Sequence, residues 1–354
     1  MNSASPWLGY GSGLVMAGAL ALFLTPVART LALRFDIVDH PGGYKRQERP
    51  IPYLGGVAIA VAAFSGVVVS EAVRGVPSWG QAAVVLGMCA VLVAVGLTDD
   101  VRNLPPLPRL FAQALAALVV IMLGARVQLV DSALAEILLT VLWVVGITNG
   151  MNLLDNMDGL AAGVTAVSSA WLFVMAAVNG QYLVAGLLAA LVGASLGFLR
   201  HNFHPATIYM GDAGSLCVGF LLAVAAMRLR FDAPIEYTWL VPVLALGLPI
   251  LDTSYVTIAR IARGDNPLSG GRDHISHRLV EVGFTVRGAV GILYGVAFVF
   301  GFLAFVASLV GDWPAYLIAA GAFGVGMLGV GLLDRRAGFS QISDARGTTE
   351  EEVA

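Results

Sequence analysis

The sequence predicts an all-α polytopic integral membrane protein, on the basis of its composition and of the spacing of its apolar runs. Of its 354 residues, 58% are hydrophobic and only 12% are charged, and the mean hydropathy is +0.83. Soluble domains carry about 25% charged residues, so this composition lies outside the soluble class. The apolar residues also gather in runs of ~17 to 25, the length at which a helix crosses hydrocarbon.

We expect eleven such spans, with ten as the alternative. The first span follows an N-terminus without positive charge. Its apolar run continues to about Leu33, which is too long for the core of a signal peptide, so we expect it to be uncleaved. The eleven runs lie near residues 8–33, 54–73, 80–98, 109–125, 132–148, 159–178, 182–199, 213–230, 238–262, 288–310 and 314–333.

The basic residues predict which side of the membrane each connection faces. Alternation places the connections 34–53, 99–108, 149–158, 200–212, 263–287 and the tail from 334 on one side. Of the 20 Lys and Arg, only Arg74, Arg126, Arg228 and Arg230 belong to the other side. The positive-inside rule therefore makes the first set cytoplasmic, with the N-terminus outside and the C-terminus inside. A multi-pass protein in the plasma (inner) membrane follows.

The chain is expected to form one transmembrane domain over residues 1–335. The polar remainder, 336–354, contains a run of three Glu at 350–352 and is predicted to be a disordered cytoplasmic tail. Cys89 and Cys217 lie inside apolar runs and offer neither a disulfide framework nor a ligand cluster, so we interpret them as packing residues. We expect no nucleic-acid partner.

The densest polar stretch lies between two apolar runs and spans ten residues. It contains Asn149, Asn152, Asp155, Asn156 and Asp158. Carboxylates and amides beside hydrocarbon are costly unless they face water, a partner or a metal. A capped, solvated turn would account for one or two of these residues but not for five. We therefore interpret the stretch as the centre of a functional site.

Two further cytoplasmic connections carry acids. Asp99 and Asp100 are adjacent and repel each other unless one is protonated or both share a cation; a structural pair is the alternative. The stretch from Gly211 to Ser215 places Asp212 between two glycines, where the backbone can closely approach a phosphate or a metal. A helix cap is the alternative for this stretch.

Basic and histidine residues accompany the acids. The connection 34–53 carries Lys45 and Arg46, which could instead hold orientation or touch anionic headgroups. The connection 263–287 carries His274, His277 and Arg278, a combination suited to phosphate, although histidines in a wet loop are often idle. Further polar candidates are Arg109, Gln113, Arg200, His201, Asn202 and His204.

All of these motifs fall in the predicted cytoplasmic set, so we expect them to build a single site. Its acids suit a divalent cation, and its Arg, Lys and His suit anions. A transporter or flippase for a lipid-linked anion is the alternative of a different class. That alternative requires polar groups along a path across the membrane, whereas the span centres are nearly free of charge.

Four linked motifs resemble, in order and spacing, the signature of the polyprenyl-phosphate N-acetylhexosamine-1-phosphate transferases, over roughly residues 10–330. They are Asp99-Asp100, the Asn149 to Leu160 stretch, Gly211 to Ser215, and His274-x-x-His277-Arg278. The resemblance implies that a polyprenyl phosphate and a UDP-N-acetylhexosamine give polyprenyl-pyrophosphoryl-sugar and UMP, as the first membrane step of a cell-envelope glycan pathway. It also implies Mg²⁺, with Mn²⁺ as an alternative ion, and allows a homodimer.

The resemblance assigns roles position by position. Asp212 is similar to the main metal ligand, with Asn152 as a second. Asp99 and Asp100 resemble acids that face the lipid phosphate, while Asp155 and Asp158 match positions near the nucleotide. The catalytic residues implied are Asp99, Asp100, Asp155, Asp158, Asp212 and His277; the substrate-binding residues are Lys45, Arg46, Arg109, Asn149, Asn152, Arg200, Asn202, Ser215, His274 and Arg278.

The chain also departs from the family pattern. Arg109 stands where many members have Lys, Gln47 where many have His, and Ser276 where a further His is common. Members that use the muramoyl-pentapeptide nucleotide resemble one another in three consecutive His at this last place. The resemblance is therefore closer to the branch that uses UDP-N-acetylglucosamine, and transfer of phospho-N-acetylmuramoyl-pentapeptide is the alternative.

The chemistry agrees with these residue types. Phosphoryl transfer needs positioning and neutralisation of charge more than covalent work by the protein. A phosphate monoester has a second pKa of about 6 and is therefore already ionised at neutral pH. We expect direct attack of the lipid phosphate on the sugar nucleotide rather than an aspartyl-phosphate intermediate.

Overall fold

Long apolar helices make up nearly all the regular structure of the chain. Its computed structural model describes residues 5–39, 50–75, 79–266 and 271–351, without the side chains of Glu236 and of residues 338–351. Within these ranges, eight helices are long and apolar enough to cross a membrane: α1 (Pro6–Arg34), α2 (Gly55–Arg74), α3 (Trp79–Arg102), α5 (Ala133–Leu154), α6 (Leu160–Val178), α7 (Tyr182–Asn202), α13 (Val286–Leu309) and, over Asp312–Ala337, the first part of α14 (Asp312–Glu351). The protein is an all-α polytopic membrane protein, as the sequence predicted. The count of eleven spans and their orientation stay predictions.

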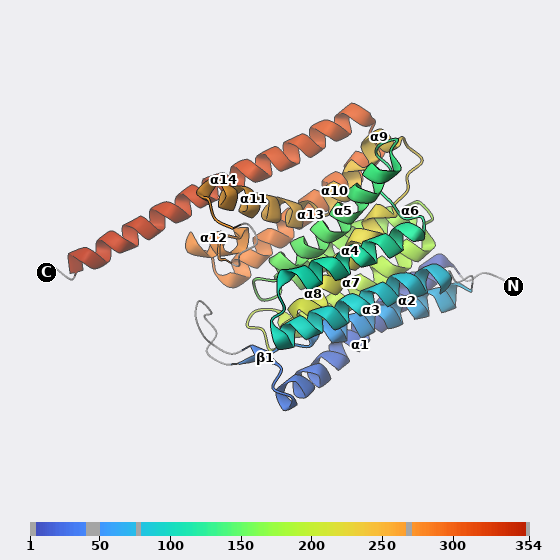
Figure 1. Cartoon of the computed structure of the whole chain (residues 1–354), viewed down its shortest axis with the longest axis horizontal. Helices are drawn as coiled ribbons and strands as arrows, with labels where there is room; N and C mark the ends of the chain where they lie inside the picture. The colour runs from blue at the N-terminus through green and yellow to red at the C-terminus, as the bar shows by residue number, and fades with distance from the viewer. Residues whose placement is uncertain (1–4, 40–49, 76–78, 267–270, 352–354) are drawn as a thin grey trace.

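Two shorter apolar helices, α4 (Pro106–Met122) and α8 (Gly211–Met227), add to these. Helix α8 is the centre of the bundle, packed against α2, α3 and α5 (Figure 1), and every residue from Ala213 to Met227 is buried. Cys217 in α8 meets Cys89 in α3, with 2.9 Å between their sulfur atoms, and both are free and fully buried. The interpretation of the two cysteines as packing residues is confirmed.

The run predicted as a single span over 238–262 is broken, so the prediction of one continuous helix was wrong. Residues 235–263 form α9 (Ile235–Thr238), α10 (Leu240–Ala245) and α11 (Gly247–Arg263) instead. The backbone leaves the helix at Leu246. Pro249 has no N–H to donate to the carbonyl of Ala245, so the helical ladder loses a bond at this point. The break allows α11 to take its own direction toward the polar connections.

These polar connections gather at one end of the bundle, which we call the polar end. It contains residues 35–39, 50–54, 103–105, 155–159, 203–210, 264–266 and 271–274, together with α12 (Ile275–Glu281). The strands β1 (Val38–Asp39) and β2 (Ile51–Pro52) pair antiparallel there, and the N–H of Tyr209 donates to the carbonyl of Pro52. The described N-terminal residues lie at the opposite end (Figure 1).

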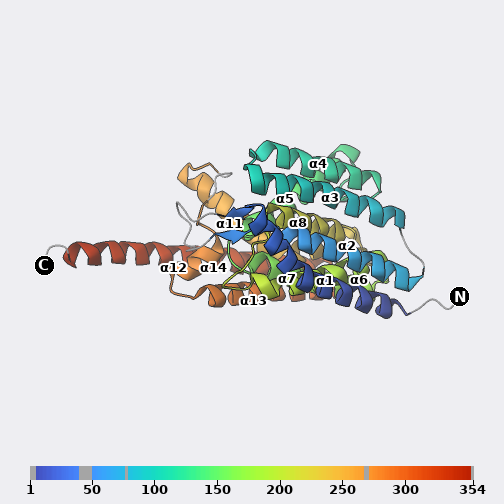
Figure 2. The same ribbon diagram turned by 90° about the horizontal axis from the view of Figure 1, so that it is seen from below.

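Helix α14 continues past the bundle beyond the polar end, as both ribbon views show (Figures 1 and 2). Its 40 residues make a helix of about 60 Å, twice the ~30 Å of hydrocarbon. The helix therefore continues to Glu351, where the sequence predicted a disordered tail from 336. Residues 338–351 contain no proline to interrupt the helical hydrogen bonds. The division into a membrane domain and a tail stays a prediction.

Candidate active site

Asp212 lies in the first turn of α8 because the helix begins at Gly211, two residues earlier than predicted. Gly211 has a φ of +70°, a left-handed conformation that favours glycine. The carboxylate of Asp100 accepts the backbone N–H groups of Asp212, at 2.8 Å, and Ala213, at 3.2 Å. Asp100, at the end of α3, thus satisfies two of the donors that open α8. It also complements the dipole of that helix.

Two further helices reach the Asp212 side chain. Arg109 of α4 places its Nη1 atom 2.7 Å from Oδ2 of Asp212 and 2.7 Å from Oδ2 of Asp99. Asn152, near the end of α5, donates its Nδ2 to Oδ1 of Asp212, at 2.6 Å, and to Oγ of Ser215, at 2.9 Å. The predicted residues Asp99, Asp100, Arg109, Asn152, Asp212 and Ser215 therefore form one site.

Asp155 completes an acid cluster that we define as Asp99, Asp100, Asp155 and Asp212. It is the C-cap of α5 and accepts a backbone hydrogen bond from Gly211. Burial raises the pKa of the Asp155 carboxyl well above its usual range, and the negative charges of Asp212, Asp100 and Asp158 raise it further. A bound cation would relieve this crowding of negative charge.

The donor set fits a hard divalent cation in type, although the described side chains do not surround a metal position as drawn. No group of three or more His, Cys, Asp or Glu among the described residues is arranged around a common metal point. Asp99 and Asp212 nevertheless converge on one positive atom, Nη1 of Arg109. Carboxylate and amide oxygens are the ligands that Mg²⁺ prefers. Asn152 would have to turn its amide oxygen toward the ion, since its nitrogen now faces Asp212.

Asp158 and Asn202 brace the loops beside the acid cluster. Oδ2 of Asp158 lies 2.7 Å from Nδ1 of His204 and accepts the N–H of Ala206 at 3.0 Å. Asn202, which is 2% exposed, accepts the N–H of Gly159 and donates to the carbonyl of Ile208, each at 3.0 Å. These contacts hold the α5–α6 connection against the α7–α8 connection. The predicted catalytic role of Asp158 and substrate-binding role of Asn202 stay predictions.

The other predicted residues are dispersed. Asn149 donates to the side chain of Gln113 on α4, and Arg200 is exposed on α7. His277 is half-buried on α12. Lys45 and Arg46 lie outside the described residues.

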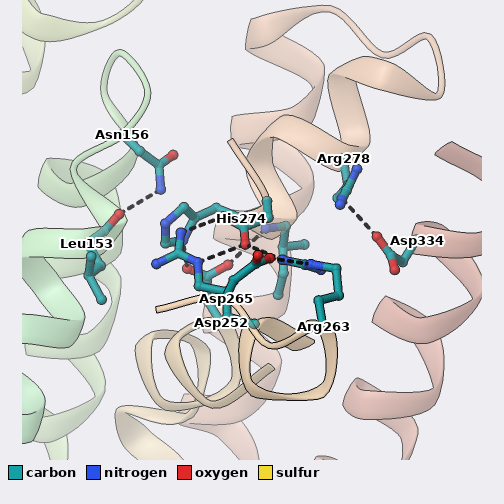
Figure 3. Close-up of polar contacts among 11 residues, drawn as sticks. Leu153, Asn156, Asp252, Arg263, Asp265, His274, Arg278 and Asp334 are labelled. Carbon is teal, nitrogen blue, oxygen red and sulfur yellow. Dashed lines mark hydrogen bonds and ion pairs between the residues drawn. The ribbon is translucent and has the colours of Figure 1, made fainter. Parts of the chain in front are cut away.

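Arg278, on α12, was predicted to bind substrate. The structure places its guanidinium 2.9 Å from Glu281 and 2.9 Å from Asp334 of α14 (Figure 3). These acids compete with a substrate phosphate for the same guanidinium, so its predicted role stays a prediction.

Sequence reasoning did not name several residues at the polar end. Asp252, a buried acid of α11, lies 2.7 Å from His274. A lone Asp within an apolar helical run was the available signal for Asp252. Tyr53 and Tyr209 form an aromatic pair with ring centroids 6.1 Å apart; no spacing rule connects two residues so distant in sequence.

A hollow of about 550 Å³ lies between the end of α11 and α12. Four arginines line it, against three carboxylates, those of Asp265, Asp273 and Glu281. Asp273 pairs with both Arg260 and Arg263, and Glu281 pairs with Arg278. Because its charges nearly balance, the hollow is not a strongly cationic anion site, and we assign no substrate to it.

The two members of the acid pair are expected to differ in importance. An Asn in place of Asp100 has one acceptor oxygen for the two N–H groups that open α8, so Asp212 loses part of its backbone support. Asp99→Asn removes one partner of Arg109, which keeps Asp212. We expect kcat/KM to fall roughly 30-fold in Asp100→Asn, in line with one lost hydrogen bond to a charged group. In Asp99→Asn we expect a smaller fall of about 5-fold, because Arg109 keeps its contact with Asp212. Equal losses, measured by product release from purified variants, would contradict these separate tasks.

A polytopic bundle that gathers four carboxylates and an arginine at one end defines a class of protein, the membrane enzymes that handle phosphorylated substrates at the bilayer surface. Comparison with known proteins makes the class specific. The family model described as glycosyl transferase family 4 matches residues 82–230. The chain belongs to this family of glycosyl-1-phosphate transferases, as the relatives below show over most of its length.

Three relatives illustrate the likeness. A probable undecaprenyl-phosphate N-acetylglucosaminyl 1-phosphate transferase of Bacillus subtilis is 30% identical over 306 residues, which are 84% of each chain. A decaprenyl-phosphate N-acetylglucosaminephosphotransferase of Mycolicibacterium smegmatis is 32% identical over 78% of this chain and 77% of its own. An undecaprenyl-phosphate alpha-N-acetylglucosaminyl 1-phosphate transferase of Escherichia coli is 27% identical over 74% of each chain. The family resemblance seen in the motifs is thereby confirmed.

Proposed function

We propose that this chain transfers N-acetylglucosamine 1-phosphate from UDP-N-acetylglucosamine to a polyprenyl phosphate, either undecaprenyl or decaprenyl phosphate. The products are polyprenyl-pyrophosphoryl-N-acetylglucosamine and UMP. The observation that carries the proposal is the convergence of Asp99, Asn152 and Asp212 with Arg109, from four helices, in a member of this family. Such a site offers oxygen ligands for a cation and a guanidinium for phosphate, as transfer between two phosphorylated partners requires.

Mg²⁺ is the proposed cofactor. Asp212 and Asn152 would hold it, with Asp99 close by, because the carboxylates of Asp99 and Asp212 meet at the point that the guanidinium of Arg109 now neutralises. Asn152 would add its oxygen after its amide turns, since its nitrogen now faces Asp212. When bound, the ion supplies charge neutralisation on the pyrophosphate of the sugar nucleotide. Arg109 is then available to pair with a phosphate oxygen instead of two carboxylates.

The proposed reaction is a direct displacement. A phosphate oxygen of the lipid attacks the β-phosphorus of the sugar nucleotide, the bond from that phosphorus to the UMP oxygen breaks, and UMP leaves. The phosphate is already ionised at neutral pH, so no carboxylate of the cluster needs to act as a strong base. An aspartyl-phosphate intermediate would instead make the enzyme exchange labelled UMP with UDP-N-acetylglucosamine without lipid. Observation of that exchange would exclude direct attack.

The polar end is proposed to lie on the cytoplasmic side of a bacterial inner membrane. The positive-inside count supports this orientation, since sixteen of the 20 Lys and Arg belong to the predicted cytoplasmic set. A homodimer is part of the proposal as well. Labelling of single introduced cysteines by an impermeant thiol reagent in intact cells tests the orientation, and mass measurement in detergent tests the dimer.

The sugar specificity gives a direct test of the proposed function. Ser276 bonds to Asn156 at the place where muramoyl-pentapeptide enzymes resemble one another in three consecutive His. We expect kcat/KM for UDP-N-acetylglucosamine to be at least tenfold higher than for UDP-N-acetylmuramoyl-pentapeptide, a preference of about 1.4 kcal/mol in transition-state binding. UMP release by purified protein, with undecaprenyl phosphate and Mg²⁺, measures both values.

Two other outcomes of this assay would have a different meaning. An equal or reversed preference would place the chain on the muramoyl branch. Absence of UMP release with every UDP-sugar, when folded protein is assayed with undecaprenyl phosphate, would favour the transporter alternative.

A further inference from the structure

Asp252 of α11 is a buried carboxylate that the proposed reaction does not use. It is 1% exposed and lies on a helix whose neighbouring residues Leu248, Leu251 and Val256 are buried apolar side chains. A charge in such surroundings is costly unless it is paired and hydrogen-bonded. Asp252 is both, because its Oδ2 lies 2.7 Å from Nδ1 of His274 and its Oδ1 accepts the N–H of Ile275 at 2.9 Å. The carboxylate is therefore hydrogen-bonded to two consecutive residues at the start of α12.

The residue before this pair is held by the same helix. Arg260 of α11, 3% exposed, makes two hydrogen bonds to the carboxylate of Asp273, and Arg263 makes a third at 3.0 Å. Burial alone would raise the pKa of Asp273, but the hydrogen bonds from Arg260 hold it down, to about 2. Residues 273, 274 and 275 are thus all fixed to α11, and Figure 3 shows these contacts gathered around His274.

The other side of α12 is tied to the stretch that carries Asp155. Oγ of Ser276 donates to Oδ1 of Asn156 at 2.6 Å. Nδ2 of Asn156 donates to the carbonyl of Leu153 at 2.7 Å, a bond that Figure 3 shows. Asn156 is the neighbour of Asp155, whose carboxylate belongs to the acid cluster. Helix α12 therefore connects α11 to residues 155–159, which we call the acid-bearing loop. Asp252 binds α12 from one side, and Asn156 binds it from the other.

The partner of Nδ1 also determines the tautomer of His274. A carboxylate accepts but does not donate, so a neutral His274 carries its proton on Nδ1, and Nε2 is left as an acceptor. His274 is 3% exposed, so its ring has little freedom to turn away from this arrangement. A residue that fixes both the orientation and the tautomer of a histidine in this way acts through that histidine.

We propose that Asp252 is a positioning residue of the transferase, which acts through His274 to fix α12 against the acid-bearing loop where the nucleotide sugar binds. This inference rests on the proposed function and adds a residue that none of the sequence motifs contains. Loss of the contacts from Asp252 to residues 274 and 275 lets α12 shift relative to Asn156 and thereby lowers kcat/KM for the nucleotide sugar. The lipid phosphate, which the sequence resemblance assigns to Asp99 and Asp100, is not affected.

The first test is Asp252→Asn, which keeps the volume and keeps an oxygen for the N–H of Ile275. Its NH₂ group faces Nδ1 of His274 and favours the opposite tautomer. We expect kcat/KM for UDP-N-acetylglucosamine to fall roughly 30-fold, within the 10–100-fold that loss of an orienting carboxylate costs, while KM for undecaprenyl phosphate stays within about twofold. The matched control is Asp265→Asn, an exposed acid of the same connection paired only with Arg263 among the described contacts, for which we expect wild-type activity.

A second measurement separates positioning from plain structural support. In protein labelled with ¹⁵N-histidine, with the signal assigned through His274→Gln, we expect His274 to carry its proton on Nδ1 in the wild type and on Nε2 in Asp252→Asn. The double variant Asp252→Asn/His274→Gln should be no less active than His274→Gln, because the two residues act as one unit. Additive losses, an unchanged tautomer, or wild-type kcat/KM in folded Asp252→Asn would each overturn the proposal.

A double replacement keeps the proposal testable if Asp252→Asn does not fold. Asp252→Leu/His274→Phe exchanges the buried polar pair for an apolar pair of similar shape, and replacement of a buried ion pair by packed apolar residues is often neutral or stabilising. We expect a folded protein with at least the same roughly 30-fold loss for the nucleotide sugar. Wild-type activity of this variant would show that the pair serves stability alone. Because wild-type turnover is measured beside it, such a failure is distinct from a failure of the proposed function.

Discussion

Asp212→Asn is expected to lower kcat roughly 1,000-fold, about 4 kcal/mol of transition-state stabilisation, while the protein remains folded. The carboxylate accepts from Arg109 and Asn152, and its backbone N–H is bound by Asp100, so the change reaches the centre of the cluster without altering its size. An amide retains one acceptor oxygen but loses the charge that would hold a divalent cation. Turnover is measured as UMP release at saturating substrates.

The structure offers a closely matched control in Asp312→Asn. Asp312, like Asp212, is the acidic residue in the first turn of an apolar helix, but it is exposed and lies where α14 begins, at the end of the bundle opposite the polar end. We expect that variant to keep wild-type kcat. A second readout is stabilisation by Mg²⁺ in thermal unfolding, which should be present in the wild type and in Asp312→Asn and absent in Asp212→Asn. Wild-type turnover and Mg²⁺ response in Asp212→Asn would contradict the assignment of Asp212 as metal ligand.

Topology explains how much of the acid cluster could be predicted from sequence. Helices that alternate in direction bring every second connection to the same side, so Asp99, Asp155 and Asp212 could be assigned to one face without any knowledge of packing. The sequence could not indicate which atoms would meet there. Asp100 binds the backbone of α8, whereas Asp99 binds Arg109. Which of these two adjacent residues faces which partner depends on how α3 is turned about its own axis.

The parts that could not be predicted depend on side-chain direction and on contacts between distant residues. Spacing placed Asp158 in the same motif as Asp155, but the chain turns between them, and Asp158 points to His204 and Ala206 instead. Asp252 lies in a run that was interpreted as a plain span. The break at Leu246 and the return of the chain at α12 bring Asp252 to His274, and neither follows from hydropathy.

The way in which α8 begins leads to the second large effect, at Gly211. This residue has a φ of +70°, and a Cβ atom added to it would lie 2.7 Å from Oδ2 of Asp100 and 2.9 Å from Oδ1. Gly211→Ala therefore combines a backbone cost of about 1–2 kcal/mol with displacement of the carboxylate that supports Asp212. We expect kcat/KM to fall roughly 100-fold, because a small misplacement of reacting groups is costly.

Gly75→Ala separates the two causes. Gly75 has a φ of +76°, nearly the same as Gly211, but nothing lies within 4 Å of an added Cβ, and the residue follows α2 at the end of the bundle opposite the polar end. Both variants should lose the backbone cost of about 1–2 kcal/mol in the free energy of unfolding, and Gly211→Ala should lose more because its Cβ also displaces Asp100, yet only Gly211→Ala should lose activity. If the two variants retained equal kcat/KM, the contact between Asp100 and the start of α8 would have no part in catalysis. Asp100 would then be a helix cap alone.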